Sequence, residues 1–135
     1  MIVVDTNIIA YLYIAGERSV DAEALLHYDS EWYVPVLWRS EFNSVLNRYR
    51  RNDMLSLYDV LEIMQRAESL LADYEYPVSS AEVLALADMS QCSTYDCEFV
   101  ALSQRLRLPL ITEDKKIHRE FPETALSIQA YMTAE

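Results

Sequence analysis

A single glycine, Gly16, stands in this chain of 135 residues, and its isolation excludes several kinds of ligand-binding fold. A phosphate-binding loop needs two glycines at fixed spacing, and a dinucleotide-binding fingerprint needs three. Neither motif can be present. Nucleotide-binding sites of these two kinds are therefore excluded.

Length and composition indicate a single domain over residues 1–135. The hydrophobic content of 52% and the charged content of 24% are ordinary for a globular protein, and no linker or repeat interrupts the chain. No apolar run reaches the roughly 18 residues of a membrane helix, so we expect no membrane span. The start MIVVD has no basic leader, so we expect no signal peptide. Cys92 and Cys97 lie too close together for a disulfide framework, which favours a reducing, cytoplasmic setting.

The chain is strongly acidic, with 22 acidic and 11 basic side chains and a net charge of −11. This balance argues against a protein that coats nucleic acid, because phosphate binding usually rests on a basic surface. The overall acidity does not exclude a local basic patch. The acidity also suits a protein that binds cations or a basic partner.

Short apolar runs alternate with longer segments of helical periodicity. We predict strands over 1–4, 32–34, 74–78, 108–112 and 125–128, and helices over 17–27, 37–51, 55–71, 79–88 and 93–106. This alternation is typical of a parallel sheet covered by helices on both faces. The fold class is therefore α/β, a three-layer α/β/α sandwich with a short-stranded, mainly parallel sheet. A helical hairpin over 37–71 is inserted between two strands.

Two aspartates follow predicted strands. Asp5 ends the first apolar run, and Asp114 lies two residues after the strand that ends at Thr112. Ligands bind at the carboxyl ends of strands in open parallel sheets, so the two carboxylates share one edge if both strands are central. The alternative is that both are helix caps or solvated loop acids, and Asn7 is an equally suitable cap.

Two further carboxylates fall on predicted helices. Glu41 comes three residues after Trp38 and four before Val45, so it borders or joins the inward stripe of its helix. Buried carboxylates are rare unless they are paired, hydrogen-bonded or bound to a cation. The alternative is a half-exposed margin position. Asp96 closes the sequence Ser93-Thr94-Tyr95-Asp96, which matches a capping box and, taken alone, favours a cap over a ligand.

Four carboxylates in one cleft would repel one another unless a divalent cation neutralised them. Oxygen-only ligation selects hard ions, Mg²⁺ or Mn²⁺. Such sites polarise phosphoryl oxygens and generate hydroxide from bound water. The chemistry implied is hydrolysis of a phosphodiester or a phosphomonoester.

Four segments, MIVVDTNIIAYL, SEFNSVL, STYDCEFVALS and LPLITEDKKI, resemble in order the acidic motifs of the PIN-domain ribonucleases, in particular the VapC-type toxins of type II toxin–antitoxin pairs. The resemblance implies a PIN-like fold and a metal-dependent endoribonuclease. It also implies an RNA substrate, a cognate antitoxin, and a homodimer within a toxin–antitoxin hetero-oligomer. By this resemblance the catalytic carboxylates are Asp5, Glu41, Asp96 and Asp114, the metal ligands are Asp5, Asp96 and Asp114, and the supporting polar residues are Thr6, Asn7 and Thr112.

The chain departs from the family pattern at two places. Glu113 stands where relatives often carry a small residue, which adds negative charge near the expected metal. The sequence Met89-Ser90-Gln91 stands where relatives usually carry glycine, which would reshape one wall of the cleft. The residues that could contact RNA are Arg39, Arg48, Arg50, Arg51, Lys115 and Lys116. Ordinary solvated helix charge is the alternative interpretation of these cations.

Two other functions compete with the nuclease. One is a metal-free binding module of the same fold. The other is a haloacid-type magnesium phosphatase, whose first motif needs a second Asp two residues after the first, where this chain has Asn7. If the chain is a toxin, we expect an antitoxin arginine to enter the acidic cleft. The hairpin would then supply one wall of a groove for an antitoxin helix.

Overall fold

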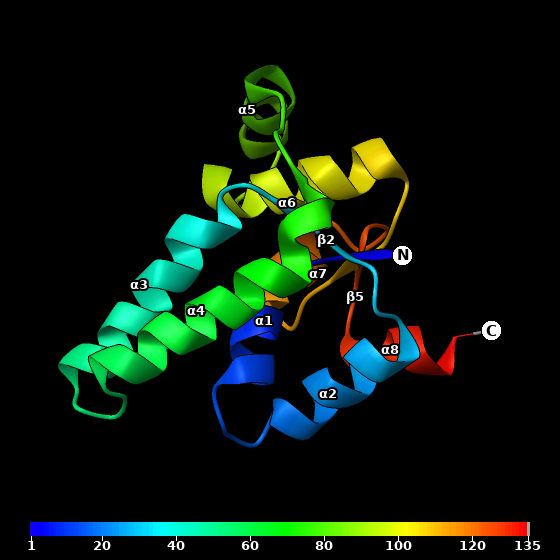
Figure 1. The fold of residues 1–135 in the computed structure, drawn as a ribbon. Coiled ribbons are helices and arrows are strands. Elements are labelled where there is room, and N and C mark those ends of the chain that lie inside the picture. The colour runs from blue at the N-terminus through cyan, green and yellow to red at the C-terminus, as the bar shows by residue number, and fades with distance from the viewer. Residues whose placement is uncertain (135) are drawn as a thin grey trace.

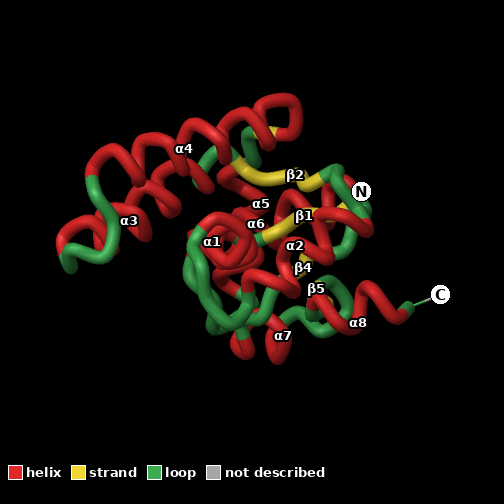
Figure 2. Tube along the Cα trace, turned by 60° about the horizontal axis from the view of Figure 1, so that its bottom comes forward, coloured by secondary structure: helices red, strands yellow, loops and turns green. Residues whose placement is uncertain are grey.

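The computed structural model describes residues 1–134, which form one parallel sheet with helices on both sides (Figures 1 and 2). The strands are β1 (Ile2–Val4), β2 (Trp32–Pro35), β3 (Glu75–Tyr76), β4 (Leu110–Ile111) and β5 (Ala125–Leu126). Their order across the sheet is β3-β2-β1-β4-β5, and every neighbouring pair is parallel. β1 is central, with Val3 aligned with Tyr33 of β2 and with Leu110 of β4. The predicted α/β class is confirmed.

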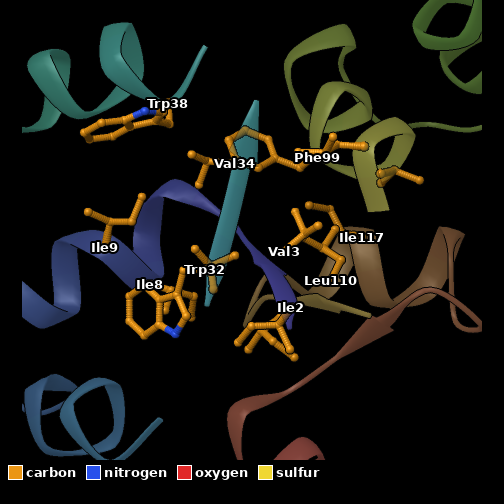
Figure 3. Close-up of a cluster of buried hydrophobic side chains, with 14 of the residues drawn as sticks. Ile2, Val3, Ile8, Ile9, Trp32, Val34, Trp38, Phe99, Leu110 and Ile117 are labelled. Carbon is orange, nitrogen blue, oxygen red and sulfur yellow. The ribbon is translucent and has the colours of Figure 1, made fainter. Parts of the chain in front are cut away.

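The helices follow the strands in the alternating order expected of a parallel sheet. They are α1 (Thr6–Tyr13), α2 (Ser19–Tyr28), α3 (Trp38–Arg51), α4 (Leu57–Leu71), α5 (Ser80–Asp88), α6 (Thr94–Leu106), α7 (Lys115–Glu120) and α8 (Ile128–Thr133), with a short 3₁₀ helix, η1 (Ala72–Tyr74). α6 packs against β1, β2 and β4, and α1 lies on the other side of these strands (Figure 3). α3 and α4 form the predicted hairpin between β2 and β3, which projects from the body in Figure 1. No helix within residues 1–134 is both long and apolar enough to cross a membrane.

The core explains why the strands can be so short. Every residue of β1 is fully buried, as the continuous apolar run of a two-sided parallel strand requires. Trp32 of β2 and Trp38 of the hairpin (Figure 3) add the two largest side chains of this core, and Phe42 of the hairpin is fully buried beside them. Burial of apolar side chains on both faces therefore stabilises the sheet more than the few hydrogen bonds between its short strands.

Several elements differ from the sequence prediction. α1, α7 and α8 were not predicted as helices, because α1 is almost uniformly apolar and the other two have six residues each, too few to display a period. The strand expected over 74–78 is confined to Glu75–Tyr76, and the strand expected over 125–128 ends at Leu126. Leu57 and Leu61, which repeat at helical spacing in α4, are 58% and 61% exposed.

Within residues 1–134, two residues take the left-handed conformation that usually favours glycine. Asp53 has φ 57° in the hairpin turn just after α3, where the sequence predicted a helix break, and Arg107 has φ 58° at the end of α6. The left-handed backbone conformation is higher in free energy for a residue with a side chain than for glycine. A chain with one glycine thus places ordinary residues at both of these turns.

Candidate active site

Four carboxylates from four separate elements line one cavity of about 310 Å³. Asp5 follows β1, Asp114 follows β4, Glu41 lies on α3 and Asp96 lies in the first turn of α6. Because β1 and β4 are adjacent and parallel, their carboxyl ends meet at one edge of the sheet. The structure therefore brings together all four acids that the sequence singled out.

Asp5 is both a helix cap and a buried carboxylate. Its Oδ1 accepts hydrogen bonds from the backbone N–H groups of Asn7 (3.0 Å) and Ile8 (3.2 Å), which caps α1. Its Oδ2 accepts a hydrogen bond from the hydroxyl of Thr112. Asp5 is only 7% exposed, and burial raises its pKa to about 6, an effect that these three hydrogen bonds oppose and the charge of Asp114 reinforces. The alternative in which Asn7 caps the helix is wrong, since Asn7 lies inside α1.

Glu41 is half-buried at the edge of the inward face of α3. The hydroxyl of Thr6 donates a 2.6 Å hydrogen bond to its Oε1. Burial raises the pKa of Glu41, and the charges of Asp96 and Glu98 raise it further, whereas the bond from Thr6 lowers it. Thr6 and Thr112 thus each hold one carboxylate of the cavity, as the resemblance implied for these positions.

Asp96 forms only half of a capping box. The hydroxyl of Ser93 accepts a 3.0 Å hydrogen bond from the backbone N–H of Asp96, which caps α6. At Ser56 and Asp59, the chain completes such a box, with a return bond from the Ser56 N–H to the Asp59 carboxylate. Among the described residues, Asp96 makes no such return bond, and it lines the cavity instead.

Asp114 caps the short helix α7, since its Oδ1 accepts a hydrogen bond from the Ile117 N–H at 3.1 Å. Its own backbone N–H donates to the hydroxyl oxygen of Thr112 at 3.0 Å. The fully buried Thr112 therefore links the backbone of Asp114 to the carboxylate of Asp5. The two strand-end acids are joined through one hydroxyl group.

The donor set of this cavity consists of oxygen atoms, which suits a hard divalent cation. Within residues 1–134, no group of three or more His, Cys, Asp and Glu side chains is arranged to hold a metal ion by itself. Mg²⁺ commonly keeps several waters and takes one or two carboxylates from the protein. The residues therefore fit a largely hydrated ion better than an ion enclosed by protein ligands.

Arg48 is the arginine that lines the cavity. It is exposed, and it makes no salt bridge with any residue that the structure describes. It also borders a second hollow, lined in part by Tyr11, Gly16 and Tyr49, that shares Asn7, Val45 and Arg48 with the first. A free guanidinium thus stands where the two hollows meet.

The other cations predicted to contact RNA lie outside the cavity. Arg39 is engaged within the fold, because it pairs with both oxygens of Glu75 at 2.6 and 2.8 Å and with Glu68. Arg50 lies 3.4 Å from Asp53. The remaining three, Arg51, Lys115 and Lys116, are exposed.

The residues at the two departures from the family pattern do not line the cavity. Glu113 does not line it, and its carboxylate is paired with Arg18 at 2.8 Å. The segment 89–91 also lies outside the lining. Sequence reasoning did not identify four lining residues, Ser44, Val45, Phe99 and Ile117. Ser44 had a usable signal, because it lies one helical turn after Glu41.

The arrangement of acids and strands defines a class of protein that comparison with known sequences identifies. The sequence profile of the PIN domain matches residues 2–122, so the chain belongs to the PIN domain family, as its motifs indicated. It is 28% identical over 124 residues to ribonuclease VapC3 of Pyrobaculum aerophilum, an alignment that covers 90% of this chain and 95% of that protein.

Solved structures share the fold. A toxin–antitoxin complex from Klebsiella pneumoniae has a chain with a TM-score of 0.69 and 20% identity, covering 95% of this chain and 98% of that one. FitAcB from Neisseria gonorrhoeae gives a TM-score of 0.75 at 15% identity, covering 96% and 99% of the two chains. PAE2754 from P. aerophilum gives 0.73 at 15% identity, with coverage of 96% and 92%.

Proposed function

We propose that this chain is a divalent-metal-dependent endoribonuclease that hydrolyses RNA phosphodiester bonds as the toxin of a toxin–antitoxin pair. The observation that carries the proposal is the convergence of Asp5, Glu41, Asp96 and Asp114 on one cavity. Membership of the PIN domain family and similarity to a protein named ribonuclease VapC3 support the same activity.

In this proposal, Asp5, Asp96 and Asp114 hold a largely hydrated Mg²⁺ or Mn²⁺, in part through its water ligands, and Glu41 completes the acidic wall. When bound, the ion would generate a nucleophile from water and stabilise charge on the phosphoryl oxygens. Thr112 and Thr6 keep the carboxylates of Asp5 and Glu41 in place through their hydroxyl groups. A nearby cation favours the charged form of a carboxylate, so it would offset the effect of burial on Asp5.

The RNA backbone would be held by Arg48, because its guanidinium is free and lines the same cavity as the carboxylates. Arginine matches phosphate geometry with two parallel hydrogen bonds. The second hollow shares Arg48 with the cavity, is lined in part by Tyr11 and Tyr49, and would receive the strand next to the cleavage site. Two aromatic rings beside a cation are the usual composition of a site that stacks unpaired bases.

The antitoxin would cover the free end of the hairpin. Four large apolar side chains lie exposed there: Met54 (66%), Leu57 (58%), Tyr58 (74%) and Leu61 (61%). Grouped exposed apolar residues mark surfaces that bind other proteins. A fold neighbour comes from a toxin–antitoxin complex, which supports a partner of this kind. We also propose a homodimer within the hetero-oligomer, and a cytoplasmic setting in which Cys92 and Cys97 stay as free thiols.

The proposal is tested by incubating the purified chain with RNA in Mg²⁺, in Mn²⁺ and in EDTA. Asp96→Asn protein prepared identically controls for contaminating nucleases. We expect cleavage with either ion, and none in EDTA or with the variant. Undiminished cleavage in EDTA contradicts the metal requirement. If the wild-type chain leaves every RNA intact yet still binds an antitoxin, a metal-free binding module becomes the better account.

A further inference from the structure

Each of the three consecutive residues after β4 has its own side-chain contacts. The side chain of Thr112 bonds to Asp5, that of Asp114 lines the acidic cavity, and that of Glu113 lies outside the cavity. Thr112 is also held through its main chain, since its N–H donates to the carbonyl of Leu126 at 3.0 Å and its carbonyl contacts the His118 ring at 2.6 Å. Glu113 is one of the two places where the sequence departs from the family pattern.

Both carboxylate oxygens of Glu113 have a partner. Its Oε1 lies 2.8 Å from the guanidinium of Arg18, and its Oε2 accepts a 2.8 Å hydrogen bond from the backbone N–H of Ile128, the first residue of α8. The side chain is only 21% exposed. Glu113 therefore joins the loop after β4 to two helices that are remote from it in sequence.

Arg18 carries this connection back toward the cavity. It lies at the start of α2, and its guanidinium carbon is 5.2 Å from the ring centre of Tyr11 on α1. α1 is the helix that Asp5 caps. Contacts thus run from the loop that bears Asp114, through Glu113 and Arg18, to the helix that bears the other strand-end acid.

We infer that Glu113 is a positioning residue that aims Asp114 into the cavity, an inference that rests on the proposed role of Asp114 in metal binding. Asp114 has extended backbone angles, φ −73° and ψ 117°. Neighbouring side chains on extended backbone project to opposite sides, so anchoring Glu113 outward turns Asp114 inward. The charge of Glu113 is at the same time neutralised by Arg18, so it adds little to the repulsion among the four cavity acids.

Two substitutions separate the contacts of Glu113. Glu113→Ala removes both, whereas Glu113→Gln removes the ion pair and keeps an oxygen that accepts from the Ile128 N–H. The matched control is Glu82→Ala, which breaks an exposed Glu–Arg pair with Arg105 (3.7 Å) away from the cavity. Each protein is compared with wild type by thermal unfolding, so that a variant that fails to fold is recognised and Glu113→Gln then carries the test.

The first measurement is hydrogen exchange at the N–H groups of Asp114 and Ile117, in metal-free protein without RNA. We expect exchange to become about tenfold faster in Glu113→Ala and less so in Glu113→Gln, because local opening costs less free energy once the anchor is lost. The second is Mn²⁺ affinity, measured as free Mn²⁺ by electron paramagnetic resonance. We expect the affinity to fall about tenfold or more, as is typical when a residue that orients a metal ligand is removed.

A double variant tests whether Glu113 acts through Arg18. Glu113→Gln with Arg18→Gln should bind Mn²⁺ no more weakly than the worse single variant, because both changes break one connection. The inference is overturned if exchange at Asp114 and Mn²⁺ affinity in Glu113→Ala stay within twofold of wild type, or if Glu82→Ala changes them equally. A wild-type chain that binds Mn²⁺ without cleaving RNA would refute the proposed function. The Mn²⁺ affinities of wild type and the Glu113 variants would still test the role of Glu113. If the wild-type chain binds no Mn²⁺, the hydrogen-exchange rates alone decide whether Glu113 positions Asp114.

Discussion

The hydroxyl of Thr112 donates a hydrogen bond to the carboxylate of Asp5, across 107 positions of sequence and between the ends of two adjacent strands. The bond lowers the pKa of Asp5, in opposition to the burial that raises it. Thr112 is fully buried, so water has no ready access to replace a lost hydroxyl. Thr112 therefore favours the ionised form of Asp5 against the larger effect of burial.

We expect Thr112→Val to raise the pKa of Asp5 above its value of about 6. A hydrogen bond to a charged group contributes on the order of 1.5 kcal/mol, which corresponds to about one pH unit. The titration of the Asp5 carboxyl carbon in metal-free protein, followed by NMR, measures the change. Thr112→Ser keeps the hydroxyl and should titrate as wild type does. An unchanged midpoint in Thr112→Val would contradict the assigned role of the bond.

Asp5→Asn should abolish RNA cleavage while making the metal-free chain more stable. Burial raises the pKa of Asp5 from 3.8 to about 6, so the contribution of this carboxyl to stability is complete below pH 3.8 and is lost as the pH rises through 6. Asparagine cannot ionise, and the free energy of unfolding at pH 8 should therefore rise by about 2 to 3 kcal/mol. Denaturant unfolding at pH 8 and at pH 4 measures this, and the gain should vanish at pH 4. Full cleavage by Asp5→Asn would make Asp5 a purely structural residue.

Arg48→Ala should weaken RNA binding without changing the fold. The side chain is exposed and free of salt bridges among the described residues, so its removal leaves no buried charge behind. Loss of a charge-assisted bond to phosphate should raise KM about tenfold. Arg51→Ala, on the same helix but outside the cavity, is the matched control. A wild-type KM in Arg48→Ala would remove Arg48 from the substrate path.

An antitoxin arginine should enter the acidic cavity and block it. Four carboxylates in one cleft attract a cation, and arginine can bridge two carboxylate oxygens at once. Replacement of each antitoxin arginine by alanine should identify one whose loss relieves inhibition of RNA cleavage. The contact of this arginine should weaken as the salt concentration rises, whereas the apolar contacts should persist. If every such antitoxin still inhibits fully at saturation, the antitoxin acts by covering the chain elsewhere.

The hairpin contact has its own test, Leu61→Ser. This leucine is 61% exposed near the free end of the hairpin, and Leu84 on α5 is exposed to the same 61%, so Leu84→Ser is a matched control. Loss of a buried leucine contact costs about 1.5 to 3 kcal/mol, so antitoxin affinity should fall at least tenfold in Leu61→Ser. Calorimetry of the toxin with its antitoxin measures both variants. A larger effect of Leu84→Ser would move the docking surface to α5.

The positions of the four acids were predictable because each depends on a local signal. Asp5 and Asp114 follow apolar strands, and Glu41 falls at the margin of a helical stripe. The parallel pairing of β1 with β4, which brings the first two together, follows from the alternation of strands and helices. The half-formed capping box at Asp96 could not be distinguished from a complete one, because the pattern fixes the backbone N–H and not the direction of the carboxylate.

Other features depend on contacts between remote segments, and no local pattern encodes them. The sequence predicts Arg39 as an RNA contact and gives no sign of its ion pairs with Glu68 of α4 and Glu75 of β3. The partner of Glu113 lies 95 positions away, at Arg18. Helical spacing in α4 predicted an apolar stripe, and spacing alone cannot show whether another part of the chain covers it; Leu57 and Leu61 remain exposed.

The order of the strands also governs when the site can exist during synthesis. Asp5 leaves the ribosome 107 residues before its hydroxyl partner Thr112, and its fellow acid Asp114 emerges after Thr112. A nascent chain whose β4 is still inside the ribosome cannot complete the central pairing with β1. It therefore lacks one wall of the cavity. Contacts between such distant segments form late in folding. A ribosome that makes this protein is therefore not exposed to an assembled acidic centre before β4 and Asp114 have emerged.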